Sequence, residues 1–398
     1  MSSISTSVPV EGSQPLPPGY PLLRLGFRPF YLLGVSVAAL GIPLWIARYY
    51  GWLPGLPNVG LYWHMHEMVF GFALAIVIGF LYTAVRAWTG LPTARGTPLA
   101  LLGVLWIAGR IAMLLTDPLT AAVIDGLFIP VAALPLYLVL RRANNRRNLF
   151  LILLLALLTA TNLLYHCAVL GVISLVPTLP VEGAILIIVL LVSIIGARVI
   201  PTFTKNTLPA VIPLIHAKRD RISVALVVIC TASWLLGLPP ALMAALAAAT
   251  GVSLSIRLLF WKPWRTWRVP LLWILHLSYA WIAVGFFLLA LAALGMTPVS
   301  AAFHAFTVGA MAGMIIGMVT RTALGHTGRP LRAGTAETTM YVLIQLGAVT
   351  RLCAALAPAQ WREHALLAST VCWSAAFLLY LAVYGPYLLQ TRIDGRDG

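Results

Sequence analysis

The chain is 398 residues long, and 61% of its residues are hydrophobic whereas only 9% are charged. Soluble domains carry about 25% charged residues, so this composition excludes a soluble globular fold. The net charge of +16 alone would suit a nucleic-acid binder, but the basic residues lie between long apolar runs and not in one continuous patch.

Apolar runs long enough to cross a bilayer, about 20 residues each, follow one another along the whole chain. They lie near residues 30–50, 64–86, 97–115, 119–140, 148–172, 181–203, 221–238, 239–258, 269–294, 299–321, 336–357 and 365–390. The sequence therefore predicts an all-α polytopic membrane protein with twelve transmembrane helices. We expect one transmembrane domain over 30–390, a cytoplasmic N-terminal tail over 1–29 and a cytoplasmic C-terminal tail over 391–398.

The basic residues alternate with these runs. If the N-terminus is cytoplasmic, all of the 26 basic residues except Arg48, Arg110, Arg351 and Arg362 fall at cytoplasmic ends of the spans. Membrane proteins carry an excess of Lys and Arg in their cytoplasmic loops. The charge thus predicts a topology with both termini in the cytoplasm, and the expected partner is the lipid bilayer and not a nucleic acid.

The second and tenth spans contain a repeat. When the chain is shifted by 238 positions, residues 66–97 fall on 304–335 without a gap, and His66 meets His304. The sixth span joins this register more weakly, through Gly196. Spans two, six and ten are therefore predicted to be equivalent members of three four-helix units.

A ridge of small residues accompanies each of the two histidines. The ridges are Gly71, Ala75 and Gly79 in one span, and Gly309, Gly313 and Gly317 in the other. At about 100° per residue each ridge lies opposite its histidine, and small residues let membrane helices approach closely. We expect the ridges to pack against neighbouring helices, while His66 and His304 hold one planar cofactor from its two faces.

Histidines at one depth are the main candidates for metal ligands. His64, His66, His166 and His304 all lie in the outer half of their spans, whereas His276 lies nearer the inner side. Buried ionisable groups in membranes are costly and usually functional, and imidazole suits iron, copper and zinc alike. For any single histidine, a hydrogen bond to a neighbouring helix is an equally good explanation.

Two further polar features accompany these histidines. Glu67 follows His66 in the first turn of its helix, where it would orient a ligating imidazole, carry protons in catalysis, or only cap the helix. In the fifth span Thr159, Asn162 and His166 form a polar stripe. We expect this stripe to face the interior of the bundle.

Four segments of the chain resemble the NnrS family of bacterial membrane proteins. They are Leu-Gly-Phe-Arg-Pro-Phe (25–30), Trp-His-Met-His-Glu-Met (63–68), Gly-Ala-Arg-Val-Ile-Pro-Thr-Phe-Thr (196–204), and His-Ala-Phe-Thr-Val-Gly-Ala (304–310), which leads to Thr-Arg-Thr-Ala-Leu-Gly-His-Thr-Gly-Arg-Pro-Leu (320–331). The resemblance implies a haem- and copper-containing protein of the cytoplasmic (inner) membrane, with haem of the b type, that binds and detoxifies nitric oxide in the nitrosative stress response.

The resemblance also implies distant kinship with haem–copper oxidases, in which histidines on spans two and ten hold one haem. That role would fall to His66 and His304. The copper histidines of the oxidases lie on spans six and seven, and this chain has none there. A copper site would have to use others, such as His64, His166 or His276.

Three functions stay open at this point. The first is reduction of nitric oxide to nitrous oxide, with electrons from a quinone or a redox partner because the chain has no Cys-x-x-Cys-His site for a c-type haem. The second is a haem-based sink or sensor for nitric oxide without turnover. The third is a membrane transporter, although transporters often contain inverted repeats and the matching helices here run in the same direction.

Overall fold

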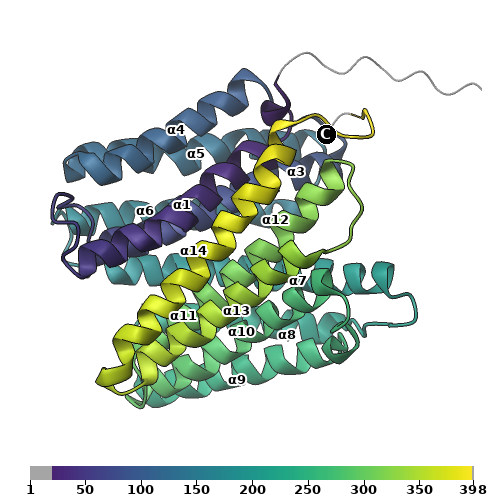
Figure 1. Cartoon of the computed structure of the whole chain (residues 1–398). Coiled ribbons are helices and arrows are strands. Elements are labelled where there is room, and N and C mark those ends of the chain that lie inside the picture. Colours follow the sequence, from purple (N-terminus) through teal and green to yellow (C-terminus); the bar gives the residue numbers. More distant parts are fainter. Residues whose placement is uncertain (1–19, 397–398) are drawn as a thin grey trace, which may run out of the picture.

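The computed structural model describes residues 20–396, which form a bundle of helices without a strand in that range (Figure 1). A helix lies at each of the twelve predicted places. The helices are α1 (Phe27–Tyr49), α2 (Leu61–His66) with η2 (Glu67–Ala73) and α3 (Leu74–Thr89), α4 (Thr97–Leu115), α5 (Pro118–Arg142), α6 (Phe150–Val169), α7 (Thr178–Thr207), α8 (Ala217–Leu235), α9 (Pro240–Leu259), α10 (Pro270–Ala293), α11 (Val299–His304) with η5 (Ala305–Ala312) and α12 (Gly313–His326), α13 (Thr335–Leu356) and α14 (Ala359–Leu389). Short 3₁₀ turns are η1 (Pro21–Leu23), η3 (Arg146–Asn148) and η4 (Pro263–Arg265).

Eleven of these helical segments are long and apolar enough to cross a membrane. The predicted span at 221–238 is the difference, because α8 begins at Ala217 and takes Lys218, Arg219, Asp220 and Arg221 into its first turns. Its apolar part is therefore shorter than the other spans. It still packs between α7 and α9, so the twelve-helix all-α arrangement stands, with α8 as its least apolar member.

The two ends of the described chain meet at one end of the bundle. Figure 1 shows α14 lying alongside α1, and these helices are in contact. The buried guanidinium of Arg28 donates to the backbone oxygens of Leu388 (2.8 Å) and Gln390 (2.7 Å). A cation at a helix C-terminus is favourable, so Arg28 helps to fix the end of α14 beside the start of α1.

The N-terminal boundary differs from the prediction. The helical turn η1 begins at Pro21 and α1 begins at Phe27, before the predicted start of the first span at 30. The Gly96 amide donates to the Leu23 oxygen (2.8 Å), which ties η1 to the start of α4. The rest of the predicted N-terminal tail, 1–19, and the last two residues of the C-terminal tail lie outside the described residues.

The repeat between the second and tenth spans appears in the backbone. Directly after His66 the helix changes to the π-helical segment η2, and directly after His304 it changes to η5. Both then return to an ordinary α-helix. Since π-helical turns inside α-helices are rare and often lie at functional sites, this match supports the register found in the sequence. The sixth span, α7, is α-helical throughout and lacks this feature.

Each ridge of small residues packs against a neighbouring helix, as predicted. A Cβ atom at Gly309 would collide with Trp281 of α10, and one at Gly317 would lie 2.9 Å from Leu275 of the same helix. In the second span a Cβ atom at Gly79 would lie 2.9 Å from Phe30 of α1. The ridges therefore set the close approach of spans two and ten to α1 and α10.

Candidate metal centre

His66 stands at the junction of α2 and η2, and its side chain is fully buried. Its Nδ1 lies 3.1 Å from Glu67 Oε1. Its Nε2 lies 2.9 Å from Asn162 Oδ1 and 3.2 Å from Asp125 Oδ2. Both ring nitrogens thus face oxygen atoms, and a neutral imidazole has only one N–H to donate. A proton or a metal ion at the second nitrogen would resolve this conflict.

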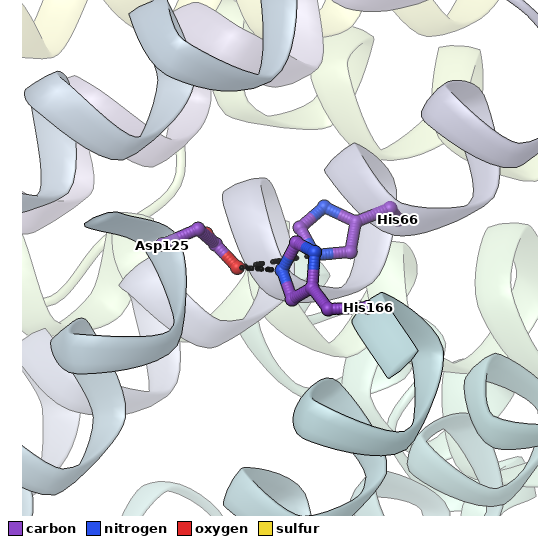
Figure 2. Close-up of side chains that lie close together, drawn as sticks. All are labelled: His66, Asp125 and His166. Carbon is purple, nitrogen blue, oxygen red and sulfur yellow. Dashed lines mark hydrogen bonds and ion pairs between the residues drawn. The ribbon is translucent and has the colours of Figure 1, made fainter. Parts of the chain in front are cut away.

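Asp125 of α5 gathers the polar groups of four helices. Its Oδ2 accepts hydrogen bonds from Asn162 Nδ2 (2.8 Å) and His166 Nε2 (3.0 Å), and its Oδ1 accepts one from Arg110. The carboxylate is 2% exposed. Figure 2 shows the two imidazoles side by side and turned toward this one carboxylate, His66 from α2 and His166 from α6.

Three donor atoms, one each from His66, Asp125 and His166, lie within 4.8 Å of one another. Ligands of one metal ion with bonds of about 2.0–2.1 Å are roughly 3 Å apart. The separations of Asp125 Oδ2 from the two Nε2 atoms, 3.2 and 3.0 Å, agree with that spacing. Two imidazoles and a carboxylate suit iron, copper or zinc, so the group can hold a transition metal.

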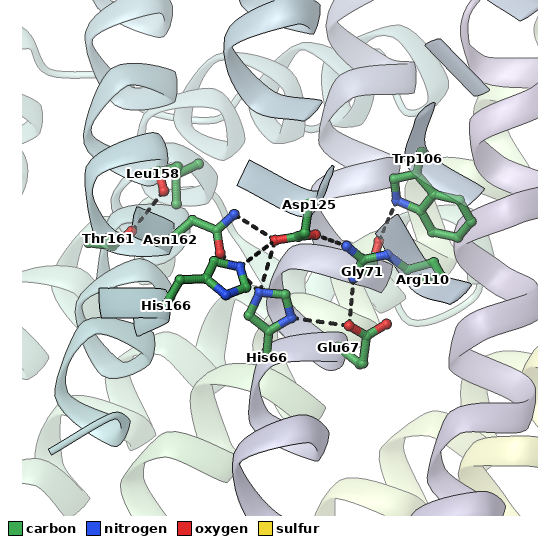
Figure 3. Close-up of polar contacts among 10 residues, drawn as sticks. All are labelled: His66, Glu67, Gly71, Trp106, Arg110, Asp125, Leu158, Thr161, Asn162 and His166. Atoms are coloured by element: carbon green, nitrogen blue, oxygen red, sulfur yellow. Dashed lines mark hydrogen bonds and ion pairs between the residues drawn. The ribbon is translucent and has the colours of Figure 1, made fainter. Parts of the chain in front are cut away.

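Glu67 and Arg110 surround this centre (Figure 3). Arg110 of α4 donates to Glu67 Oε1 (2.7 Å) and also pairs with Asp125. Its guanidinium lies 5.6 Å from the ring of Trp106, whose Nε1 donates to the Gly71 oxygen (3.3 Å). Two carboxylates against one guanidinium leave one negative charge when the imidazoles are neutral, which favours a bound cation.

Another histidine, His64, lies on a different side of the helix that carries His66. His64 is two residues before His66, about 200° around the helix. Its ring stacks on Trp45 of α1, with centroids 5.5 Å apart. Its Nδ1 is buried without a hydrogen-bond partner among the described residues. His304 of α11 and Arg351 of α13 are close enough to His64 for electrostatic interaction with its ring.

The side chain of His304 is oriented by its own helix. Its Nδ1 lies 2.6 Å from the Ser300 oxygen. This contact makes Nδ1 the N–H donor and leaves Nε2 with its lone pair. Metal-ligating histidines commonly show this arrangement, in which the second nitrogen donates to a carbonyl.

The predicted ligands are therefore grouped differently from the pairing that the repeat predicted. The structure brings His66 together with His166, with ring centroids 5.3 Å apart, and leaves His304 within electrostatic range of His64; it does not show the expected pair of His66 and His304. His276 joins neither group. Its Nδ1 contacts the Leu272 oxygen (3.0 Å), and its Nε2 lies 3.5 Å from Thr204 Oγ1 of α7.

Asp125 was not among the metal ligands predicted from the sequence, and no role was predicted for Arg110. A signal was present, because a charge inside a span is costly and usually functional. Asp125 is an acid within a span, and Arg110 and Arg351 are two of the four basic residues that break the charge alternation. The polar stripe was interpreted correctly, since Asn162 and His166 are buried, 1% and 4% exposed.

The match to a protein family covers nearly the whole chain. No curated protein matches the chain. The model of the NnrS family, described as NnrS protein, matches residues 21–392, which is nearly the whole chain and the whole of the helical bundle. The chain therefore belongs to the NnrS family, a membership that fits a role in the response to nitric oxide.

Proposed function

We propose that this chain is a copper- and haem-dependent protein of the cytoplasmic membrane that binds nitric oxide and removes it. The observation that carries the proposal is the convergence of His66, Asp125 and His166 on one point inside the bundle. Membership of the NnrS family supports the link to nitric oxide. Copper and haem would supply redox chemistry and a position at which nitric oxide binds.

The donor set of the three-residue centre fits copper. Imidazole nitrogen and carboxylate oxygen are ligands that Cu²⁺ accepts, and three protein ligands leave a coordination position for a small molecule. Glu67 accepts the N–H of His66 and so orients the imidazole. Arg110 bonds Glu67 and Asp125 together and holds both carboxylates in place.

The His64 and His304 pair fits haem iron better than His66 does. His304 keeps Nε2 available, and His64 has a buried nitrogen without a partner among the described residues. The nearby Arg351 is a suitable counter-charge for a haem carboxylate. His66, in contrast, has both ring nitrogens occupied by the polar cluster.

Removal by reduction would convert two molecules of nitric oxide, two protons and two electrons into nitrous oxide and water. A quinol or a redox partner would donate the electrons. Glu67, which is 2% exposed and lies beside His66, is the acidic group placed to hold a proton at the centre, because Asp125 would be a ligand of the metal. The same ligands would serve a nitric oxide sink, which differs only in lacking turnover.

The test is the metal content and the reduced-minus-oxidised spectrum of the purified protein, expressed with haem and copper in supply. We expect His66→Ala to lose copper and keep haem, and His304→Ala to lose haem and keep copper. The matched control is His276→Ala, which removes another buried imidazole outside both groups and should keep both cofactors. Loss of haem from both His66→Ala and His304→Ala would instead favour one haem shared by these two residues.

Turnover is tested with a nitric oxide electrode and a reduced quinol analogue. We expect the wild type to consume nitric oxide faster than the His66→Ala protein does. A stable nitrosyl spectrum without consumption would identify a sink, and a wild-type protein without haem or copper would refute the proposal.

A further inference from the structure

A second polar site lies at the opposite end of the bundle from the metal centre. A cavity of about 570 Å³ opens where α3, α7 and α12 end, and the turn at 145–148 forms another part of its wall. On the second span this region begins at Phe80, about 20 Å along the helix from His66 at 1.5 Å per residue. It lies at the same end as the two chain ends, because Arg392 donates to the His326 oxygen (3.3 Å) and His326 lines the cavity.

The cavity is basic. Arg147, Arg198 and His326 line it, and no Asp or Glu is among the lining residues. Arg147 is exposed and Arg198 is half-buried, and both side chains line the cavity. The positive-inside rule explains arginines at this end of the spans, but it would be met equally well by arginines spread over the loops. Two arginines that line one cavity without an acidic residue favour an anionic ligand.

The side of the cavity next to Arg198 is held by hydrogen bonds. Arg198 donates to Asn148 Oδ1 (3.0 Å), and Asn148 Nδ2 donates to Asn145 Oδ1 (3.1 Å). Asn148 is only 6% exposed. This buried amide fixes one part of the guanidinium, so Arg198 is positioned by the fold.

Much of the remaining wall is apolar or aromatic, and three threonines lie among these residues. It includes Phe80 and Trp88 of α3, Ile195 and Phe203 of α7, and Met318 of α12. A phosphate group alone would fill only a small part of about 570 Å³. The cavity therefore fits a ligand with an anionic head and an apolar body. Basic pockets between transmembrane helices recognise lipid headgroups in this way.

We propose that this cavity binds the phosphate headgroup of an anionic phospholipid, with Arg147 and Arg198 contacting the phosphate and the aromatic wall contacting the glycerol and acyl part. The site is separate from the metal centre and does not depend on the function proposed for it.

The test is native mass spectrometry of the detergent-purified full chain with phosphatidylglycerol or phosphatidylcholine. We expect the wild type to prefer phosphatidylglycerol. We expect the Arg147→Gln, Arg198→Gln protein to bind this lipid at least about tenfold more weakly than the wild type does. The matched control is Arg141→Gln, Arg142→Gln, which removes two exposed arginines of the end of α5 that do not line the cavity. Equal binding by the two double variants, or equal binding of both lipids by the wild type, would overturn the proposal.

A second measurement tests the proposal without the double arginine variant, in case that variant does not fold. Phosphatidylglycerol with brominated acyl chains should quench Trp88, so the quenching of the wild type should exceed that of Trp88→Phe. Inorganic phosphate at a concentration of about 10 mM should leave this difference unchanged. If inorganic phosphate abolishes it, the site binds free phosphate and the lipid assignment is wrong; if no difference exists, no lipid occupies the cavity.

Discussion

At the scale of single residues, Asp125 is the residue that contacts most members of the polar cluster. Its two oxygens face Arg110, Asn162, His66 and His166, so one carboxylate of α5 joins groups of three other helices, α2, α4 and α6. Buried ion pairs contribute little net stability when intact, but loss of one partner leaves a buried charge uncompensated. The cluster is therefore better explained by a bound cation than by stability alone.

The substitution Asp125→Asn tests this role. It removes the only carboxylate among the three donors of the centre, so we expect copper affinity to fall by about 100-fold or more. We also expect the metal-free protein to lose only about 1–3 kcal/mol of stability, because Arg110 loses one charged hydrogen-bond partner but keeps Glu67 as its counter-charge. Metal analysis and thermal unfolding in detergent measure the two effects.

The control is Asp117→Asn on the same helix. Asp117 is exposed and caps α5 by accepting from the Leu119 and Thr120 amides, and Asn is an equally good cap. Copper content and melting temperature should therefore stay as in the wild type. If Asp125→Asn behaved like this control, Asp125 would not be a ligand.

At the scale of elements, the second and tenth spans share one structural motif. Each combines a histidine, a π-helical segment directly after it and a ridge of small residues. The second span also carries His64, which points to a different side of the helix from His66. Because His64 and His66 lie about 200° apart around the helix, one helix serves both the copper site and the haem site that we propose.

The ridge predicts a difference between two glycines of the tenth span. Gly309→Ala would drive a methyl group into Trp281, whose Nε1 is held by Gln345 Oε1 at 2.7 Å. We expect a loss of about 1–3 kcal/mol, as for other overpacked sites. At Gly325 the nearest atom to an added Cβ is 3.6 Å away on Leu331, so Gly325→Ala should be neutral or stabilise by up to about 1 kcal/mol.

Thermal unfolding of the two variants in detergent provides the measurement. Both glycines lie in helical segments of the same span, so helix propensity affects them similarly and the difference reports the packing against α10. Equal melting temperatures for the two variants would show that the ridge does not set this contact.

At the scale of the whole molecule, basic residues and both described chain ends share one end of the bundle. Arg28 joins the start of α1 to the end of α14, and the basic cavity lies at the same end. The metal centre lies toward the other end, near the starts of α2 and α5. The positive-inside rule predicts that the basic end faces the cytoplasm and that the candidate metal centre lies in the outer half of the membrane.

Reporter fusions in bacteria test this orientation. A fluorescent protein joined after Gly398 should fluoresce, because it would stay in the cytoplasm. Alkaline phosphatase inserted between α1 and α2, near Gly55, should be active because that loop would lie outside. An inactive phosphatase together with a dark fluorescent fusion would mean the opposite orientation.

Much of the fold follows from local sequence. Span positions agree with the helices to within a few residues in most cases, because hydropathy and helix period act over one helix at a time. The larger differences are at helix ends outside the apolar runs: α14 begins at Ala359 where 365 was predicted, and α12 ends at His326 where 321 was predicted. The first turns of α8 are charged and were also placed outside the predicted span.

The sequence by itself determined the class of protein, the alternation of charge, the shared depth of His64, His66, His166 and His304, and the repeat that links spans two and ten. The tertiary structure alone decided which of these residues meet. The pairing of His66 with His166, and the addition of Asp125 and Arg110, depend on α4, α5 and α6 packing beside the second span. The period of a single helix fixes the direction of each side chain, but it carries no information about which helix lies opposite.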